Sequence, residues 1–128
     1  MVKGTGAEAI APILDAALRC LDQHVRVFKV FLFGSFAQGR ATSWSDIDLA
    51  VVSPDFGANP IAEAARLMEL LEDVDMRIEP KAYSVEEFLS ARRGSFLCDE
   101  VISKGLEITA SSFRREESGT QTRLTGTV

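Results

Sequence analysis

Two aspartates one residue apart, Asp46 and Asp48, offer the clearest chemistry in this chain. Alternate residues of a strand point to the same face, so the two carboxylates should lie side by side, with Cα atoms about 6.5 to 7 Å apart. Burial of the alternating apolar residues Ile47 and Leu49 can hold this strand while its carboxylate face stays open. Oxygen ligands arranged in this way could share a divalent metal ion.

Ten residues separate Ser35 from Asp46, and the Gly34-Ser35 pair ends an apolar run that is typical of a strand. Glycine adopts backbone torsions that other residues avoid, and it lets a ligand approach the main chain closely. We predict a short helix over 35–39, whose free N–H groups would suit a phosphate together with the Ser35 hydroxyl. Arg40 could add a charge-assisted contact to that phosphate, or lie solvated in the following loop.

The combination of Gly-Ser and Asp-x-Asp resembles the signature of the polymerase-beta-like nucleotidyltransferase superfamily, and the small size is similar to its minimal, stand-alone branch. The resemblance rests on Gly34, Ser35, Asp46 and Asp48 and extends over most of the chain. It implies an α+β fold with a small mixed β-sheet flanked by helices. It also implies a nucleoside triphosphate held at the Gly-Ser turn, Mg²⁺ or Mn²⁺ on the aspartates, and a third carboxylate from a later strand.

The third carboxylate has two candidates, Asp75 and Glu79, which share one face of a strand predicted over 74–80. The stretch that contains them resembles the third-carboxylate strand of the superfamily, where an acid is followed two residues later by a basic residue. Asp75 is therefore the first choice as metal ligand and general base, and Glu79 the second. Either acid could instead form a structural ion pair with Arg77.

The resemblance implies a metal-dependent nucleotidyltransferase that moves a nucleoside monophosphate, AMP from ATP, onto a hydroxyl of a protein or small-molecule acceptor. Two metal ions about 3.5 to 4 Å apart can stabilise the attacking and leaving oxygens of such a reaction. The alternative is a non-catalytic nucleotide-binding or antitoxin module that masks a partner protein such as a HEPN-domain toxin. The implied catalytic and metal-binding residues are Asp46, Asp48 and Asp75, and the implied nucleotide-binding residues are Gly34, Ser35 and Arg40.

Larger relatives carry a helical domain that binds the acceptor, so a partner protein or a second copy of the chain could supply that surface here. The net charge of −5 disfavours nucleic acid as a partner, because phosphate backbones are bound by clustered Lys and Arg. No apolar stretch reaches the roughly 20 residues of a membrane span, so we expect a cytoplasmic protein. Cys20 and Cys98 are expected to be buried free thiols, and His24 to end a helix.

The apolar pattern predicts one domain over 1–109 and a disordered tail over 110–128. Near the site, Trp44 is expected to cover the edge of the core, and Ser45 could orient Asp46 by a hydrogen bond. Ser84 and Glu87 form a capping box that should begin a short helix. The other predicted elements are helices over 7–22, 61–71 and 96–104, the last ended by Gly105, and strands over 25–33, 46–52, 74–80 and 106–109, the last an edge strand.

Overall fold

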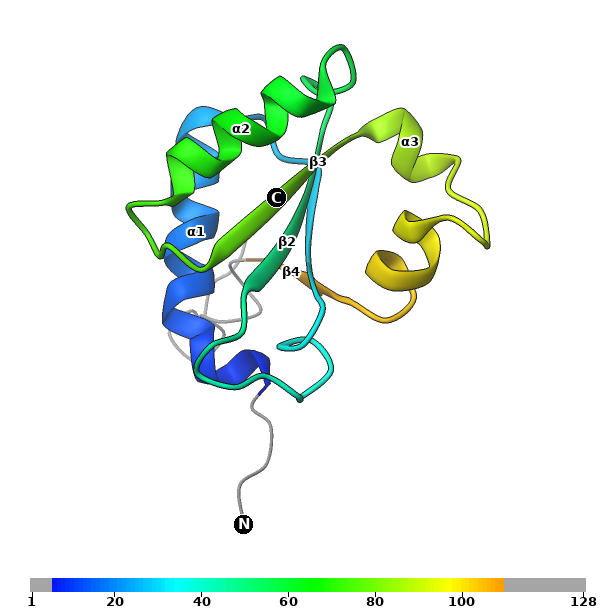
Figure 1. Cartoon of the computed structure of the whole chain (residues 1–128). Coiled ribbons are helices and arrows are strands. Elements are labelled where there is room, and N and C mark those ends of the chain that lie inside the picture. Colours follow the sequence, from blue (N-terminus) through cyan, green and yellow to red (C-terminus); the bar gives the residue numbers. More distant parts are fainter. Residues whose placement is uncertain (1–5, 110–128) are drawn as a thin grey trace, which may run out of the picture.

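A four-stranded mixed sheet forms the centre of the structure, a computed structural model that describes residues 6–109 (Figure 1). The strands lie in the order β3-β2-β1-β4; β1 is antiparallel to β2 and β4, whereas β2 and β3 are parallel. They span β1 Lys29–Phe33, β2 Ile47–Ser53, β3 Ile78–Ser84 and β4 Leu106–Ile108. The predicted fold class is confirmed, as is the edge position of β4. The predicted tail over 110–128 lies outside the described residues.

One face of the sheet is closed by the helices α1 (Ala11–His24) and α2 (Pro60–Leu71). A 3-10 turn, η1 (Ala7–Ile10), leads into α1, so Pro12 stands in the first turn of the α-helix, where its missing N–H costs no intrahelical hydrogen bond. The apolar sides of both helices and the inward residues of β2 form one continuous core, which includes Leu14, Leu21, Ile47, Leu49, Val51, Leu67 and Leu71.

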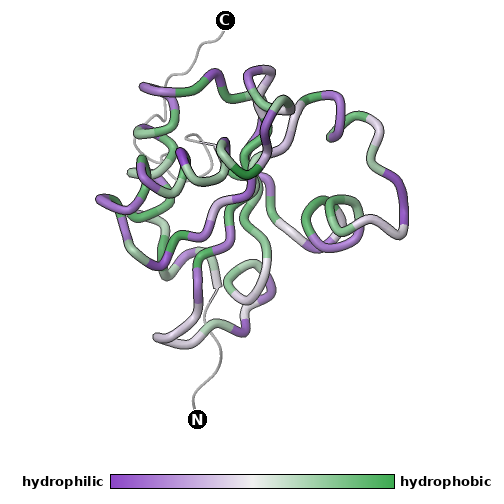
Figure 2. Tube along the Cα trace, turned by 45° about the horizontal axis from the view of Figure 1, so that its top comes forward, coloured by the Kyte–Doolittle hydropathy of each residue, from purple (hydrophilic) through white to green (hydrophobic). Residues whose placement is uncertain are grey.

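The opposite face is covered by α3 (Val85–Leu89) and by η2 (Leu97–Ile102), a π-helix in place of the predicted helix over 96–104 (Figure 1). The predicted capping box begins α3, since the Ser84 hydroxyl accepts from the Glu87 N–H at 3.0 Å and the Glu87 carboxylate accepts from the Ser84 N–H at 2.8 Å. Figure 2 shows hydrophilic and hydrophobic residues alternating along the helices, as expected for elements that bury one side. The smaller core on this face joins Phe31, Phe33, Ala50, Leu97 and Val101.

Two predicted strands begin four residues later than expected. The first begins at Lys29 rather than at residue 25. The third begins at Ile78, because the N–H groups of Val74 and Asp75 both donate to the Leu71 carbonyl, at 2.9 and 3.2 Å, and so continue the end of α2 as a turn. This shift of four residues removes Asp75 from the strand and extends the strand as far as the capping box.

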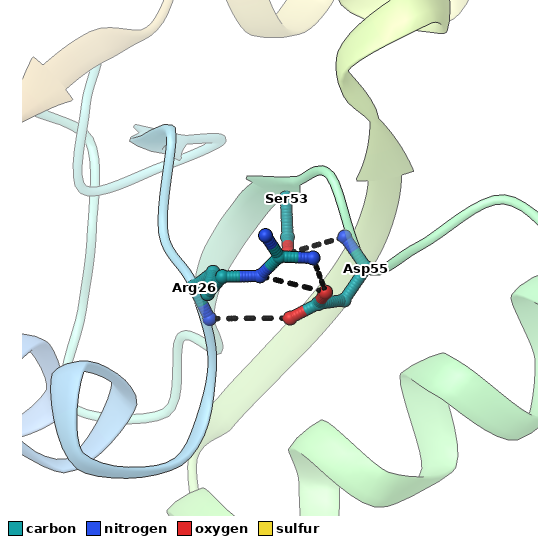
Figure 3. A network of polar contacts seen from close by, with 3 residues as sticks. All are labelled: Arg26, Ser53 and Asp55. Atoms are coloured by element: carbon teal, nitrogen blue, oxygen red, sulfur yellow. Dashed lines mark hydrogen bonds and ion pairs between the residues drawn. The ribbon is translucent and has the colours of Figure 1, made fainter.

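A polar network ties the loop after α1 to the loop after β2 (Figure 3). The Arg26 guanidinium donates to the Asp55 carboxylate, with the Nε–Oδ1 distance at 3.0 Å, and the Asp55 N–H donates to the buried Ser53 hydroxyl at 2.9 Å. The hydrogen bond from Arg26 lowers the pKa of Asp55 below its ordinary value. The network lies at the end of β2 remote from Asp46, so it supports the sheet and not the site.

The remaining predicted side chains have ordinary structural roles. Cys20 and Cys98 are free thiols, as predicted, although both are partly rather than fully buried. His24 is the last residue of α1, and its Nδ1 lies 2.9 Å from the Cys20 carbonyl oxygen. None of the helices within residues 6–109 is long and apolar enough to cross a lipid bilayer.

Gly105 is required by close packing, and not by the left-handed backbone expected of a residue that ends a helix. Its N–H donates to the Val101 carbonyl at 3.0 Å. A Cβ at this position would lie 2.2 Å from the Val101 oxygen and 2.8 Å from the Leu32 oxygen. Both neighbours are main-chain atoms, so neither can turn aside as a side chain would.

We therefore expect Gly105→Ala to lower the free energy of unfolding by about 2 to 3 kcal/mol, the range for overpacking a tight site. The matched control is Gly94→Ala, because Gly94 has φ +97° but open space around it. That substitution should cost about 1 kcal/mol through backbone conformation alone. Urea denaturation measures both, and equal losses would contradict the packing argument.

Candidate active site

The central strands bring a row of side chains together on the face covered by α3 and η2. In the strand register Phe33 of β1 lies beside Asp48 of β2, and Asp48 lies beside Glu79 of β3. Asp46 comes two residues before Asp48, at the start of β2, and is exposed. The residues between and beyond, Ile47 and Leu49, are fully buried against the helical face. Three carboxylates therefore share one sheet face, held from behind by the core.

Gly34 packs directly against the Asp48 carboxylate. The chain turns at Gly34 with φ +77°, a backbone conformation that favours glycine. A Cβ at Gly34 would lie 2.3 Å from Asp48 Oδ2. The absence of a side chain at Gly34 thus allows the Gly-Ser turn to contact the Asp48 carboxylate of β2.

Residues 35–39 form turns rather than the predicted helix. The N–H of Arg40 donates to the Ser35 carbonyl at 2.9 Å, and the N–H of Gln38 donates to the carbonyls of Gly34 and Ser35, both at 3.2 Å. Gly39 has φ +72°, which leaves the right-handed helical region and ends the turns. Phosphate binding here would depend on the main chain and hydroxyl of the turn, because there is no helix dipole to assist it.

The candidate Arg40 is exposed and points its guanidinium at a neighbour. Its Nε and Nη2 donate to the Gln38 side-chain oxygen at 3.2 and 3.1 Å. The contact is local and solvent-exposed, so it would be exchanged for an anionic ligand at little cost. Arg40 thus stays a candidate for phosphate binding, on the rim of the Gly-Ser turn.

Asp75 lies apart from the row, in the turn before β3. Its carboxylate accepts from the Arg77 N–H at 2.8 Å and from the Arg77 guanidinium at 3.1 Å through both Nε and Nη2. These hydrogen bonds lower the pKa of Asp75 below its ordinary value. Asp75 therefore closes its own turn, and the acid that the register sets beside Asp48 is Glu79.

Burial and neighbouring charge together set the electrostatics of the row. Partial burial of Asp48 raises its pKa above the ordinary value, and the nearby carboxylates of Glu79 and Asp46 raise it further. Lys81, two residues after Glu79, opposes this shift. The charged groups that shift the pKa of Asp48 are thus Glu79, Asp46 and Lys81.

This donor set suits a hard divalent cation, since carboxylate oxygens are the ligands that Mg²⁺ and Mn²⁺ prefer. A bound cation would also relieve the repulsion that raises the pKa of Asp48. In the described part of the chain, no three His, Cys, Asp or Glu side chains are already arranged to hold a metal ion. The residues fit a metal by chemistry and position, and their oxygens would have to close around it.

Two expected supporting roles are not seen. The Ser45 hydroxyl accepts from the Thr42 N–H at 2.8 Å and so fastens the loop before β2, instead of orienting Asp46. Trp44 is 90% exposed, so it does not cover the edge of the core. Both side chains belong to a loop that is held by its own hydrogen bonds.

Two residues of the site escaped the sequence reasoning, Lys81 and Phe96. Phe96, immediately before η2, packs edge-on against Phe33 with ring centroids 5.6 Å apart. The Lys81 Nζ lies 5.5 Å from the centroid of the Phe96 ring. A strand predicted over 78–84 would have set Lys81 on the face of Glu79 by simple alternation, but no pattern in the sequence connects Phe96 to either residue.

Comparison with known proteins identifies the family of the chain. The family model described as Nucleotidyltransferase domain matches residues 14–107. Crystal structures of two variants of the toxin-antitoxin MntA-HpeT share 21% and 22% identity with the chain. The first aligns over 83% of this chain and 86% of that chain with a TM-score of 0.54, and the second over 83% and 82% with a TM-score of 0.52. At such identities the likeness establishes the shared fold alone.

A more distant structure contains a tri-AMPylated HEPN toxin from Shewanella oneidensis in complex with an MNT antitoxin. It shares 22% identity over 86% of this chain and 77% of that chain, and its TM-score of 0.47 is too low to carry an argument. A search of curated protein sequences found no match.

The contact between Gly34 and Asp48 predicts a coupled effect on stability. Gly34→Ala should lower the free energy of unfolding by at least about 2 kcal/mol, because a strained backbone and a collision act together. In an Asp48→Ala background the same change should cost only about 1 kcal/mol, the backbone part. A double-mutant cycle from urea denaturation measures the coupling, and strictly additive losses would show that the two residues do not meet.

The raised pKa of Asp48 predicts that its charge opposes folding. A carboxyl whose folded pKa lies above its unfolded value of 3.8 favours folding below that value, and this contribution is lost as the pH rises through the folded pKa. In EDTA, Asp48→Asn should therefore raise the melting temperature at neutral pH, and its advantage should shrink toward pH 4. Asp75→Asn is the matched control with the opposite sign, because Arg77 lowers the pKa of Asp75. A loss of stability in both variants at pH 7 would contradict the assignment.

Proposed function

The chain belongs to the nucleotidyltransferase domain family and is a transferase, and we propose that it moves AMP from ATP onto a hydroxyl group of a partner protein. The observation that carries the proposal is the row in which Asp48 lies beside Glu79, with Asp46 on the same face and Gly34 against the Asp48 carboxylate. This arrangement gives one surface both a turn that a phosphate can approach and a set of oxygen ligands for the cation that accompanies it.

In the proposed reaction, the Gly34-Ser35 turn binds the terminal phosphates, and Asp46, Asp48 and Glu79 are the residues that would hold divalent metal. The bound metal would supply positive charge to the attacking and leaving oxygens. Glu79 accepts the proton of the acceptor hydroxyl, whose oxygen forms a bond to the α-phosphorus. The bond from that phosphorus to the bridging oxygen breaks, and pyrophosphate leaves with the electron pair.

We assign the third carboxylate to Glu79 in preference to Asp75, the first choice from the sequence. Glu79 is exposed on the carboxylate face and raises the pKa of Asp48, which requires proximity. Asp75 is held by three hydrogen bonds from Arg77, and using it as a base would mean giving these up. Using Glu79 as the base costs less free energy, because Asp75 then keeps its hydrogen bonds from Arg77.

A protein acceptor is supported by the toxin-antitoxin complexes among the structural neighbours. The net charge of −5 weakens the case for nucleic acid as acceptor. A hydroxyl of a small molecule and an acceptor surface shared with a second copy of the chain are the other forms of the same proposal. A module that only masks its partner would not need the carboxylate row, and the following experiment separates it from an enzyme.

Incubation with α-labelled ATP, Mg²⁺ and a lysate of the source cells should label a protein band. Glu79→Gln should lower this labelling by about 10²-fold or more, the usual effect of removing a general base. Asp75→Asn is the matched control, since it removes an acid four residues earlier that lies outside the row, and it should retain most of the labelling. The reverse order would return the role to Asp75.

Thermal melting supplies the binding half of this test. Mg²⁺ with ATP should raise the melting temperature of the wild type by mass action, and the rise should be lost in the Asp46→Asn, Asp48→Asn double variant. A rise without labelling would favour the masking module. An equal rise in the double variant would overturn the metal assignment.

A further inference from the structure

We propose that Lys81 is a nucleotide-binding residue that contacts the α-phosphate, on the side of the carboxylate row away from the Gly34-Ser35 turn. The inference rests on the proposed function and deepens it, since it divides the nucleotide's phosphates between two parts of the site. It starts from the strand register. Lys81 lies beside Ala50, two pairs further along β2 and β3 than Asp48 and Glu79.

The direction of this displacement follows from the sheet. Strand β1 ends at Phe33 next to Asp48, and Gly34 follows beyond it. Phe31, further from the turn, lies beside Ala50. Along the sheet, the Gly-Ser turn therefore comes first, then the pair Asp48 and Glu79, and then Lys81. The Lys81 Cα atom lies about 6.5 to 7 Å further along β3 than the Glu79 Cα atom. A lysine side chain can span that distance back toward the row.

Phe96 marks where the Lys81 ammonium lies. The Phe96 ring packs against Phe33, which lies beside Asp48, with ring centroids 5.6 Å apart. The Lys81 Nζ is 5.5 Å from the centroid of the same ring, a cation–π distance that favours a fixed position over free rotation in solvent. The Lys81 ammonium thus lies over the sheet, between the register position of Lys81 and the carboxylates. Lys81 acts to lower the pKa of Asp48, which agrees with that position.

The other basic groups near the site are either paired or placed at the Gly-Ser turn. Arg77 is bound to Asp75, and Arg40 lies on the rim of the turn with Gln38. None of the ion pairs within residues 6–109 uses Lys81. Because negative charge develops on the α-phosphate during transfer, an uncommitted ammonium beside the carboxylates suits that group. The terminal phosphates would bind at the Gly-Ser turn, on the other side of Asp48 from the register position of Lys81.

This division can be tested with ATP and pyrophosphate, which differ in the α-phosphate and the nucleoside. Both are titrated in Mg²⁺ against a bound fluorescent ATP analogue. Lys81→Met should weaken ATP about ten- to hundredfold, the effect of losing a charge-assisted contact, and leave pyrophosphate unchanged. Lys81→Arg, which keeps the charge, should recover most of the ATP affinity.

Lys29→Met is the matched control. Lys29 also lies over a phenylalanine, with its Nζ 5.7 Å from the centroid of the Phe28 ring, but at the far end of β1 and paired with Glu107. It should change neither affinity. An unchanged ATP affinity in Lys81→Met, or an equal loss for ATP and pyrophosphate, would overturn the inference and leave the proposed function standing. A wild type that binds no ATP would overturn both.

Discussion

The site depends on the close approach of the main chain at Gly34 to the carboxylate of Asp48. The approach needs a positive φ and the absence of a Cβ, and these two conditions meet in glycine alone. It fixes the end of β1 and the turn that follows against the start of β2. The candidate residues Ser35 and Asp46 lie close to this contact along the chain.

The sheet divides its two faces between stability and chemistry. Helices α1 and α2 bury Ile47, Leu49 and Val51 on one side, and this burial holds β2 in place whatever its other face carries. The second face is apolar at Phe31, Phe33 and Ala50, which pack under Leu97 and Val101 of η2. Where that cover ends, the same strands present Asp48 and Glu79. The transition from core to site therefore takes place within single strands, over two residues.

The sequence was sufficient for the local part of the site and insufficient for the part that crosses strands. Gly34, Ser35, Asp46 and Asp48 lie within one short stretch, and alternation alone sets the two aspartates on one face. The third strand was misplaced by four residues because Val74, Met76 and Ile78 alternate as well as the true strand does. Val74 and Met76 do not form a strand because the Leu71 carbonyl at the end of α2 accepts hydrogen bonds from the N–H groups of Val74 and Asp75. Lys81 and Phe96 meet only through tertiary packing, which no spacing in the sequence encodes.

The placement of Arg77 explains why the carboxylate row keeps its charge. Arg77 lies next to the row in the chain, and its main-chain carbonyl accepts from Ile47 at 2.8 Å, yet its guanidinium is turned to Asp75. Had Asp75 joined the row, Arg77 would have been free to neutralise it, and the face would have had less need of a cation. Arg77 and Asp75 pair within one turn instead. Among the charged groups that shift the pKa of Asp48, Glu79 and Asp46 raise it and Lys81 alone lowers it. The repulsion that remains contributes to the raised pKa of Asp48 and costs stability in the free protein, and a bound divalent cation would relieve it.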